Sequence, residues 1–370
     1  MPLIWSAISA HGYGHAAQVI PVLNELGRRI PSLKIILRTN VPAHFFESRM
    51  TVPWELRSAQ MDIGCLQHGP ITMDWEATWQ AHRLFHANWE ARLKEETAAI
   101  RESGADLVIG NNPYLAMAAG AAAGVPAVAL ASLSWDEILR AHVDRTQPWQ
   151  HVLLEDMRHA YGQATLLLRI TPGLPMPAFP RTRDIGPIAS PLASARDRLR
   201  AQLQIQDDEV LVLMAFGGIP FEHLPFDHME SMPGLQFLIA GPVPPRSRRV
   251  HSISGIAEPF STLLSSVDVV MTKPGYGTTI EAVAVHTPLV YVRRHDFADE
   301  DPIVQYLRQY GRGVELSRED FLNTRWEATI RDALKSPEPA FPPPACTGAA
   351  DAAAHLLPLL QRSTGTPCRS

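Results

Sequence analysis

Short apolar runs that alternate with helical patterns constrain the fold of this chain more than any other feature. In the first half the runs cover residues 3–9, 33–39, 105–110, 125–132 and 164–170. Between the first two runs, apolar residues recur at the spacing of one helical face, at Val19, Val22, Leu23 and Leu26. Such alternation is typical of parallel sheets that are covered by helices on both faces. The first half is therefore predicted to be an α/β domain.

The same alternation starts again in the second half, which predicts a second domain. Further apolar runs cover residues 209–218, 235–241, 268–272 and 288–294. Residues 172–190 are dense in proline and glycine and are predicted to form an exposed linker. A chain of 370 residues suits two domains. We expect domains over 1–186 and 187–345, a C-terminal helix over 346–362 and a disordered tail over 363–370.

Charge and cysteine content exclude some partners and compartments. The net charge is −5 and neither half is basic, which argues against a nucleic-acid surface. The three cysteines, Cys65, Cys346 and Cys368, lie far apart and lack metal-ligand spacing. We therefore expect a reduced, cytoplasmic location.

Residues 107–135 contain no charged side chain, so a membrane span has to be considered. Asparagine, proline and glycine interrupt this stretch, and its alanines add little hydrophobicity. We expect a strand, a helix and a strand here rather than a transmembrane helix. Peripheral membrane contact through an apolar patch stays open.

The stretch "KPGYGTTIEA" at 273–282 follows an apolar run and predicts a strand, a glycine loop and a helix. Gly275 and Gly277 would take turn conformations that other residues resist and let a ligand approach the backbone. Thr278 and Thr279 fall at the expected helix start, where unpaired N–H groups hold a phosphate without a metal. Glu281, one turn further, would accept hydrogen bonds from sugar hydroxyls such as a ribose diol.

The glycine motif could be a plain strand-loop-helix turn whose glycines only relieve crowding. The residues at the end of the next apolar run favour a ligand site instead. Arg293 and Arg294 are predicted at the carboxyl edge of a parallel sheet, where such sheets bind ligands. Asp299 and Glu300 follow with carboxylates suited to polyols. The motif is neither a P-loop nor a complete G-x-G-x-x-G. These features predict a sugar-diphosphate site. Ion pairing of the arginines with Asp296 or Asp299 is an alternative that does not exclude it.

This stretch resembles the donor-binding region of GT-B glycosyltransferases, above all the peptidoglycan N-acetylglucosaminyltransferase and UDP-glycosyltransferase group. Glu281 falls where that group places a glutamate on the nucleotide ribose. "KPGYGTTIEAVA…PLVYVRR" is even more similar to the glycosyltransferase-like N-terminal region of plant L-arabinokinases. The resemblance implies two Rossmann-like domains facing across a cleft, with the C-terminal helix packing back on the first. The predicted donor site also includes Gly217, Gly218, Lys273 and Tyr276.

"HGYGHAAQVIPVLNEL", from residue 11, resembles the first loop and helix of the same group. His15 matches the histidine that acts there as general base toward an acceptor hydroxyl, and an imidazole with a pKa near ~6.5 suits that role. We assign His11 a supporting role. Gly12 and Gly14 would let the loop pass close to the substrates. A metal pair, a helix cap or phosphate contact, and a purely structural role are the alternatives for the histidines.

A catalytic imidazole needs an orienting group, and three candidates follow strands of the first domain. Asn111 and Asn112 come directly after one apolar run, and Asp136 follows another. A carboxylate would orient His15 more strongly than an amide, so the amides are a departure from the expected pairing.

A row of aromatic residues and histidines is best explained by core packing of one amphipathic helix rather than by an acceptor groove. The row consists of Trp75, Trp79, His82, His86 and Trp89.

These observations predict a glycosyltransferase that moves a hexosyl group from a nucleotide-diphosphate sugar, expected to be UDP-linked, to a hydroxyl acceptor. The resemblance implies inversion at the anomeric carbon. Neither a metal nor another cofactor is expected, since residues 299–301 do not form the D-x-D metal motif in its usual setting. The alternatives are a nucleotide-sugar hydrolase or 2-epimerase, and a non-catalytic nucleotide-sugar-binding module.

Overall fold

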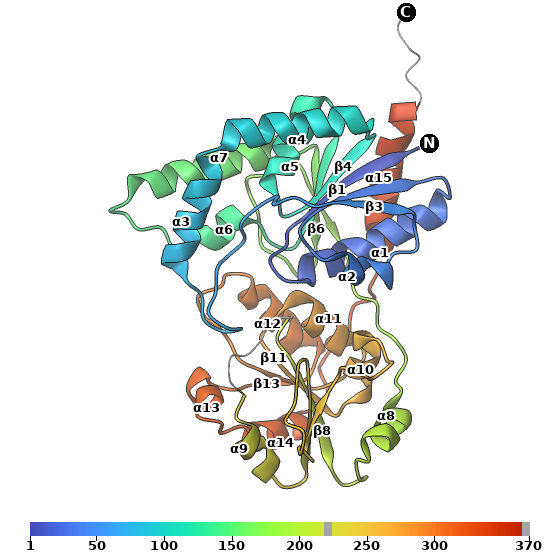
Figure 1. The fold of residues 1–370 in the computed structure, drawn as a ribbon, viewed down its shortest axis with the longest axis vertical. Helices are drawn as coiled ribbons and strands as arrows, with labels where there is room; N and C mark the ends of the chain where they lie inside the picture. Colours follow the sequence, from blue (N-terminus) through green and yellow to red (C-terminus); the bar gives the residue numbers. More distant parts are fainter. Residues whose placement is uncertain (218–223, 365–370) are drawn as a thin grey trace, which may run out of the picture. The chain divides into compact units, whose positions relative to one another are not determined.

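The computed structural model describes residues 1–217 and 224–364, and it divides the chain into two compact units. Unit 1 consists of Met1–Leu66, Asp74–Ile188 and the chain from Cys346 onward, and unit 2 consists of Gln67–Met73 and Ala189–Ala345 (Figure 1). Residues 67–73, which we expected in the first domain, thus belong to unit 2. Gly218 of the predicted donor site and residues 365–370 of the predicted tail lie outside the described residues.

Unit 1 is built on a seven-stranded parallel sheet in the order β3-β2-β1-β4-β5-β6-β7. Its strands are β1 (Leu3–Ile8), β2 (Lys34–Arg38), β3 (Trp54–Arg57), β4 (Leu107–Asn111), β5 (Ala127–Ala131), β6 (Leu166–Ile170) and β7 (Thr182–Ile185). Its helices are α1 (Gly14–Arg29), α2 (Ala43–Glu47), α3 (Trp75–His86), α4 (Trp89–Ser103), α5 (Tyr114–Ala123), α6 (Trp135–Arg140), α7 (Pro148–Gly162) and α15 (Gly348–Thr364). The strand order reverses between β1 and β4.

Unit 2 is built on a six-stranded parallel sheet in the order β10-β9-β8-β11-β12-β13. Its strands are β8 (Val210–Ala215), β9 (Leu235–Ile239), β10 (Val250–Ser252), β11 (Val269–Thr272), β12 (Leu289–Tyr291) and β13 (Gly313–Glu315). Its helices are α8 (Arg196–Leu203), α9 (Phe226–Ser231), α10 (Phe260–Ser266), α11 (Tyr276–Ala284), α12 (Glu300–Tyr310), α13 (Arg318–Leu322) and α14 (Glu327–Lys335). Here the order reverses between β8 and β11.

Helical periodicity correctly predicts α1 and the face that it buries. The four apolar residues of its predicted face are fully buried, at Val19, Val22, Leu23 and Leu26. The helix ends at Arg29, two residues before Pro31, as predicted, although it contains Pro21 in its interior. Helix α15 packs against α1 within unit 1.

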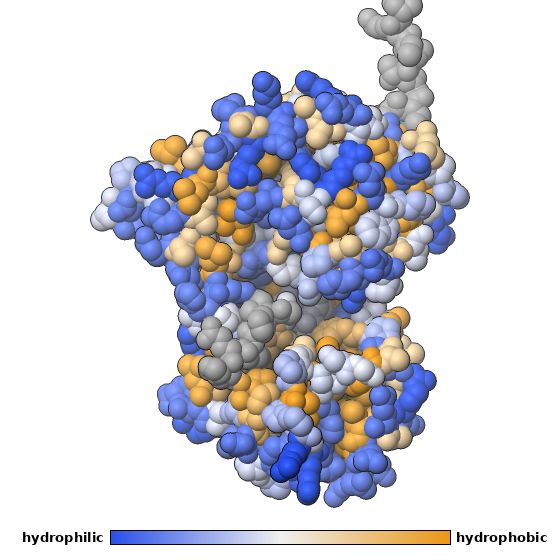
Figure 2. Space-filling view, in the orientation of Figure 1, coloured by the Kyte–Doolittle hydropathy of each residue, from blue (hydrophilic) through white to orange (hydrophobic). Residues whose placement is uncertain are grey.

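The charge-free stretch 107–135 forms β4, α5 and β5, as expected. Every residue of both strands is buried, so the stretch is a core element of the sheet. In the described part of the chain, no helix is long and apolar enough to cross a membrane. Hydrophilic residues cover much of the visible surface in Figure 2.

The prediction of an exposed linker over 172–190 is wrong for most of its length. Residues 182–185 form β7, the edge strand beside β6, and Leu174, Met176 and Phe179 are buried. Proline is tolerated next to an edge strand, because such a strand needs hydrogen-bond partners on one side only. The high proline content of this stretch is therefore the reason why β7 was not predicted from the sequence.

The aromatic row lies on two helices rather than one. α3 ends at His86 and α4 begins at Trp89, so the heptad-like spacing crosses a helix boundary. Trp79 and His82 are buried in the core, as the packing interpretation requires.

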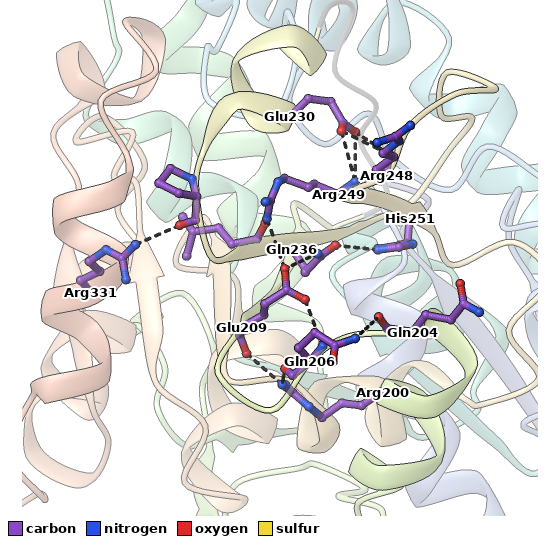
Figure 3. Close-up of polar contacts among 12 residues, drawn as sticks. Arg200, Gln204, Gln206, Glu209, Glu230, Gln236, Arg248, Arg249, His251 and Arg331 are labelled. Atoms are coloured by element: carbon purple, nitrogen blue, oxygen red, sulfur yellow. Dashed lines mark hydrogen bonds and ion pairs between the residues drawn. The ribbon is translucent and has the colours of Figure 1, made fainter.

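A polar network supports the short edge strand β10 of unit 2 (Figure 3). The carboxylate of Glu230 accepts hydrogen bonds from the backbone N–H groups of Arg248 and Arg249. Gln236 links the side chains of Glu209 and His251, at 2.8 and 2.9 Å. We interpret this network as structural, because it holds the three residues of β10 against β9.

Close contact at the start of α15 gives the first testable prediction. A Cβ on Gly348 would lie 2.2 Å from the backbone oxygen of Gly186, so Gly348→Ala should lower the free energy of unfolding by roughly 1–3 kcal/mol. Urea unfolding measures this change. Gly162→Ala is the control, since its Cβ would meet nothing nearer than 3.6 Å. Equal stabilities of the two variants would contradict the packing described here.

Candidate active site

In unit 1, the histidine loop and Asn111 meet where the strand order of the sheet reverses. The loop follows β1 and Asn111 ends β4, and these neighbouring parallel strands pair Ile8 with Asn111. The Ser9 N–H extends the pairing with a 3.1 Å hydrogen bond to the Asn111 carbonyl. Ligands of parallel α/β sheets bind at such reversal points, at the carboxyl ends of the strands.

His15 is the second residue of α1, and a chain of side-chain hydrogen bonds orients it. Its Nδ1 lies 2.8 Å from the Asn111 Oδ1. The Asn111 Nδ2 donates to the Gln18 Oε1, and the Gln18 Nε2 donates to the Ser132 Oγ. Because the Asn111 amide donates through nitrogen, its oxygen must accept, so neutral His15 carries its proton on Nδ1. The lone pair is then on Nε2.

Burial keeps His15 neutral. The side chain is only 8 % exposed, and desolvation lowers its pKa to about 4 although the Asn111 hydrogen bond acts in the opposite direction. At neutral pH the Nε2 of His15 can therefore accept a proton or a hydrogen bond. The amide of Asn111 orients the ring but adds no charge to stabilise an imidazolium.

Among the described residues, Asn112 and Asp136 form no hydrogen bond with the His15 ring. Asp136 accepts a hydrogen bond from the Ser134 hydroxyl at 2.6 Å and pairs with Arg158 at 3.4 Å. Asn112 has a left-handed backbone, with φ 76°, and is buried. Within the described residues neither polar atom of its side chain has a hydrogen-bond partner.

His11 and Asp62, a carboxylate that the sequence did not reveal, both contact Trp135. The indole ring centroid lies 5.3 Å from that of His11 and 5.7 Å from that of His15. The indole Nε1 donates to Asp62 at 2.7 Å. Asp62 lies in a loop outside any periodic element, so no pattern in the sequence indicated it.

The two glycines of the histidine loop differ in conformation and surroundings. Gly12 has φ 74°, and nothing lies within 4 Å of a Cβ on Gly14.

In unit 2, the predicted glycine motif forms the start of α11, directly after β11. Gly275 is the N-cap, and its carbonyl accepts the hydrogen bond of the Thr279 N–H. Helix geometry gives the preceding N–H groups, including those of Gly277 and Thr278, no acceptor within the helix. Together with the helix dipole they favour an anion at this end.

One expected reason for these glycines, a turn conformation that other residues resist, is wrong, and so is the crowding alternative. Gly275 has φ −96° and Gly277 is helical, so neither needs a conformation that other residues resist. A Cβ on Gly277 would have nothing within 4 Å, and one on Gly275 would meet only the Lys273 carbonyl oxygen at 3.9 Å. Gly217, at the end of β8, differs because its φ is 74°. The motif glycines leave space beside the helix start.

Lys273 places a buried amine beside this helix start. The residue is 8 % exposed, and burial, with a smaller contribution from the charge of Arg294, lowers its pKa to about 7. A Cβ on Gly217 would lie 3.9 Å from its Nζ. Among the described residues, no hydrogen bond or ion pair of the Lys273 amine is found.

The two arginines, in contrast, are paired. The Arg294 Nε donates to Glu300 at 2.6 Å, its backbone N–H donates to the same carboxylate at 2.9 Å, and Asp299 lies 3.7 Å away. Arg293 pairs with Asp301. The predicted alternative of ion pairing with Asp299 is therefore found for Arg294. Glu300 is fully buried in its pair with Arg294.

Two further carboxylates of the predicted donor site remain beside the helix start. Glu281, on α11, accepts a hydrogen bond from the Ser261 hydroxyl at 3.1 Å. Burial raises the pKa of Asp299 to about 7, although the charge of Arg294 opposes this shift. The Asp299 Oδ1 has no hydrogen-bond partner among the described residues. Within the same residues, no three His, Cys, Asp or Glu side chains gather as a metal site.

Comparison with known proteins gives one curated relative and many similar structures. No protein-family profile matches the chain. The chain is 27 % identical to L-arabinokinase of Arabidopsis thaliana over 368 residues, which is 98 % of this chain and 34 % of that protein. The chain thus spans about a third of the length of this relative.

Solved glycosyltransferases are among the structures to which the chain is similar. The chain is 17 % identical to the glycosyltransferase of kitacinnamycin, with a TM-score of 0.60 over 98 % of this chain and 96 % of that one. It is 19 % identical to the calicheamicin glycosyltransferase CalG4, with a TM-score of 0.59 over 98 % and 99 %. It is 10 % identical to UGT71G1 of Medicago truncatula, solved with UDP-glucose, with a TM-score of 0.61 over 98 % of both chains.

The orientation of His15 gives a prediction that needs no ligand. Asn111→Asp would place a carboxylate against the Nδ1, and because a negative charge favours the imidazolium, the pKa of His15 should rise from about 4 toward 6.5 or above. Titration of the histidine Cε1–H signals by NMR measures this pKa. Asn112→Asp adds the same charge one residue away and should raise it less. An unchanged pKa in Asn111→Asp would contradict the contact.

Proposed function

From the GT-B fold of this chain, we propose that it transfers a glycosyl group from a nucleotide-diphosphate sugar to a hydroxyl acceptor. The observation that carries the proposal is the buried Lys273 amine beside the open, glycine-bearing start of α11. A buried cation without a paired carboxylate is costly unless an anion joins it. A diphosphate supplies that anion.

The proposal places the donor in unit 2. The diphosphate would accept hydrogen bonds from the first N–H groups of α11 and from the Lys273 ammonium, and Glu281 would accept from the ribose hydroxyls. Glu300 already accepts hydrogen bonds from Arg294. We therefore propose that Asp299, whose Oδ1 accepts no hydrogen bond from the described residues, accepts from the hydroxyls of the transferred sugar. Arg294 then acts by holding Glu300 rather than by touching phosphate.

The proposal places the acceptor in unit 1, at the Nε2 of His15. The acceptor oxygen would form a bond to the anomeric carbon while the bond from that carbon to the diphosphate oxygen breaks, and His15 would take the hydroxyl proton. The nucleoside diphosphate leaves with an added negative charge. Lys273 and the α11 start are preorganised to stabilise that charge, so the proposal includes no metal ion or other cofactor.

The finer assignments are extensions of this proposal. We propose a UDP-linked hexose as donor and inversion at the anomeric carbon, which a single displacement would produce. The cysteine content supports a cytoplasmic location. The net charge of −5 argues against a nucleic acid as the acceptor.

One observation favours a second candidate, a nucleotide-sugar-binding module without turnover. Asn111 offers His15 an uncharged partner, so among the described residues no ion pair would stabilise the charge that forms on the imidazole. Tight donor binding without release of nucleoside diphosphate, across a broad panel of acceptors, would support this candidate.

A thermal-shift screen against UDP, GDP, dTDP and CMP sugars tests the donor site. We expect one nucleotide family to raise the Tm. Lys273→Ala and Glu281→Ala should each weaken its affinity by about 10- to 100-fold, the usual effect of losing a charge-assisted hydrogen bond. Lys335→Ala, an exposed lysine of unit 2, is the matched control. A folded protein that no nucleotide sugar stabilises would overturn the proposal.

The pH dependence of donor binding follows from Lys273. Its pKa of about 7 means that the amine is mostly neutral at pH 8.5, whereas the bound diphosphate favours the charged form. Binding should therefore take up a proton and weaken as pH rises above 7, by up to about tenfold per pH unit. Calorimetry with UDP-glucose in buffers of different ionisation enthalpy measures the uptake. Lys273→Arg stays charged, so its affinity should depend less on pH over this range, where Asp299 still titrates.

A further inference from the structure

Asp62 connects two separate parts of the histidine site. It lies in the loop between β3 and α3 and is 7 % exposed. Its Oδ1 accepts a hydrogen bond from the Ser9 hydroxyl at 3.0 Å, and its Oδ2 accepts one from the Trp135 indole Nε1 at 2.7 Å. Ser9 belongs to the loop after β1, and Trp135 begins α6. One carboxylate thus joins three segments that are distant in the sequence.

Each partner of Asp62 contacts a histidine. The Ser9 Oγ accepts a hydrogen bond from the backbone N–H of His11, at 3.3 Å. The Trp135 ring packs at a steep angle on both imidazoles, with interplanar angles of 85° to His11 and 67° to His15. Asp62 is therefore one hydrogen bond away from the loop backbone and one from the ring that borders both histidines.

The residues that follow Asp62 in the loop between β3 and α3 also contact His11. The Cys65 N–H donates to the His11 Nδ1 at 3.3 Å. Gly64 has φ 69°, and a Cβ there would lie 2.7 Å from the His11 Cβ. The buried His82 holds the Gly64 carbonyl oxygen through its Nε2, at 2.9 Å. The approach of this loop to His11 therefore depends on several contacts besides Asp62.

Burying a carboxylate at this position costs free energy, and the two hydrogen-bond donors that surround it explain why one is present. Burial raises the pKa of Asp62 to about 6, although both hydrogen bonds oppose this shift. An apolar residue would avoid that cost but would leave the buried Trp135 Nε1 without its acceptor. An aspartate accepts from the Ser9 hydroxyl and the indole at once.

We propose that Asp62 is a positioning residue of the histidine site, which fixes His11 through Ser9 and both imidazoles through Trp135. Its effect on glycosyl transfer rests on the proposed function, whereas its effect on the imidazoles does not. Asp62 acts through its two hydrogen-bond partners, Ser9 and Trp135.

The test uses the full chain with 13C at the Cε1 of its 15 histidines, without ligand. His11→Gln and His15→Gln assign the two signals by their loss. In Asp62→Ala we expect both signals to shift, because Trp135 loses the bond that orients its ring. We also expect the pKa of His15 to rise from about 4 toward 6.5, since burial is the main cause of its low value.

Two variants separate positioning from general stability. In Asp62→Asn the amide oxygen can accept from Trp135 while the amide nitrogen donates to the Ser9 Oγ, so the signals should return close to their wild-type positions. Glu96→Ala is the matched control for Asp62→Ala. Glu96 is also buried and also accepts from an indole, that of Trp5 at 2.7 Å, but its other partner is Arg38. It should lower stability without moving the signals of His11 and His15.

Unmoved His11 and His15 signals in folded Asp62→Ala would overturn the proposal, as would equal shifts in Glu96→Ala. If Asp62→Ala does not fold, Ser9→Ala breaks the first bond more mildly and should still shift the His11 signal, and an unmoved signal would overturn the proposal. Where transfer is detected, Asp62→Ala should lower kcat by about tenfold or more with an unchanged KM for the nucleotide sugar. Absence of transfer in the wild type would count against the proposed function alone.

Discussion

The pairing of β1 with β4 is the constraint on which the histidine site depends. Parallel pairing brings the carboxyl ends of both strands to one edge, and the reversal of strand order there sends their following segments to different parts of unit 1. His15 and Asn111 meet across this reversal, although 96 residues separate them. The pairing of β8 with β11 has the same consequence in unit 2, where Gly217 and Lys273 come together.

Burial controls the charge of the groups at both edges. His15 in unit 1 and Lys273 and Asp299 in unit 2 are all buried. Desolvation favours the neutral form of each group, so it lowers the pKa of His15 and Lys273 and raises the pKa of Asp299. A neutral imidazole suits proton acceptance. An amine that titrates near pH 7 becomes charged when an anion joins it, so the donor site couples binding to protonation.

The sequence predicts the parts of the fold and site that depend on local pattern. Periodicity finds most central strands and the buried face of α1, and the glycine motif locates the start of α11. Proline density hides β7, because an edge strand tolerates residues that a central strand would not. The pair of Arg294 with Asp299 was anticipated as an alternative, but its closer partner Glu300 was not, since the choice of Glu300 rather than phosphate depends on how α12 packs. Asp62 lies in an irregular loop, so only the tertiary structure brings it to Ser9 and Trp135.

A crystal structure of the chain with UDP-glucose, or with whichever nucleotide sugar stabilises it most, would test the central claim most directly. The account predicts that the diphosphate lies at the start of α11, within hydrogen-bond distance of the Gly277 or Thr278 N–H and of the Lys273 Nζ. A nucleotide bound elsewhere, with Lys273 and the start of α11 untouched, would contradict it.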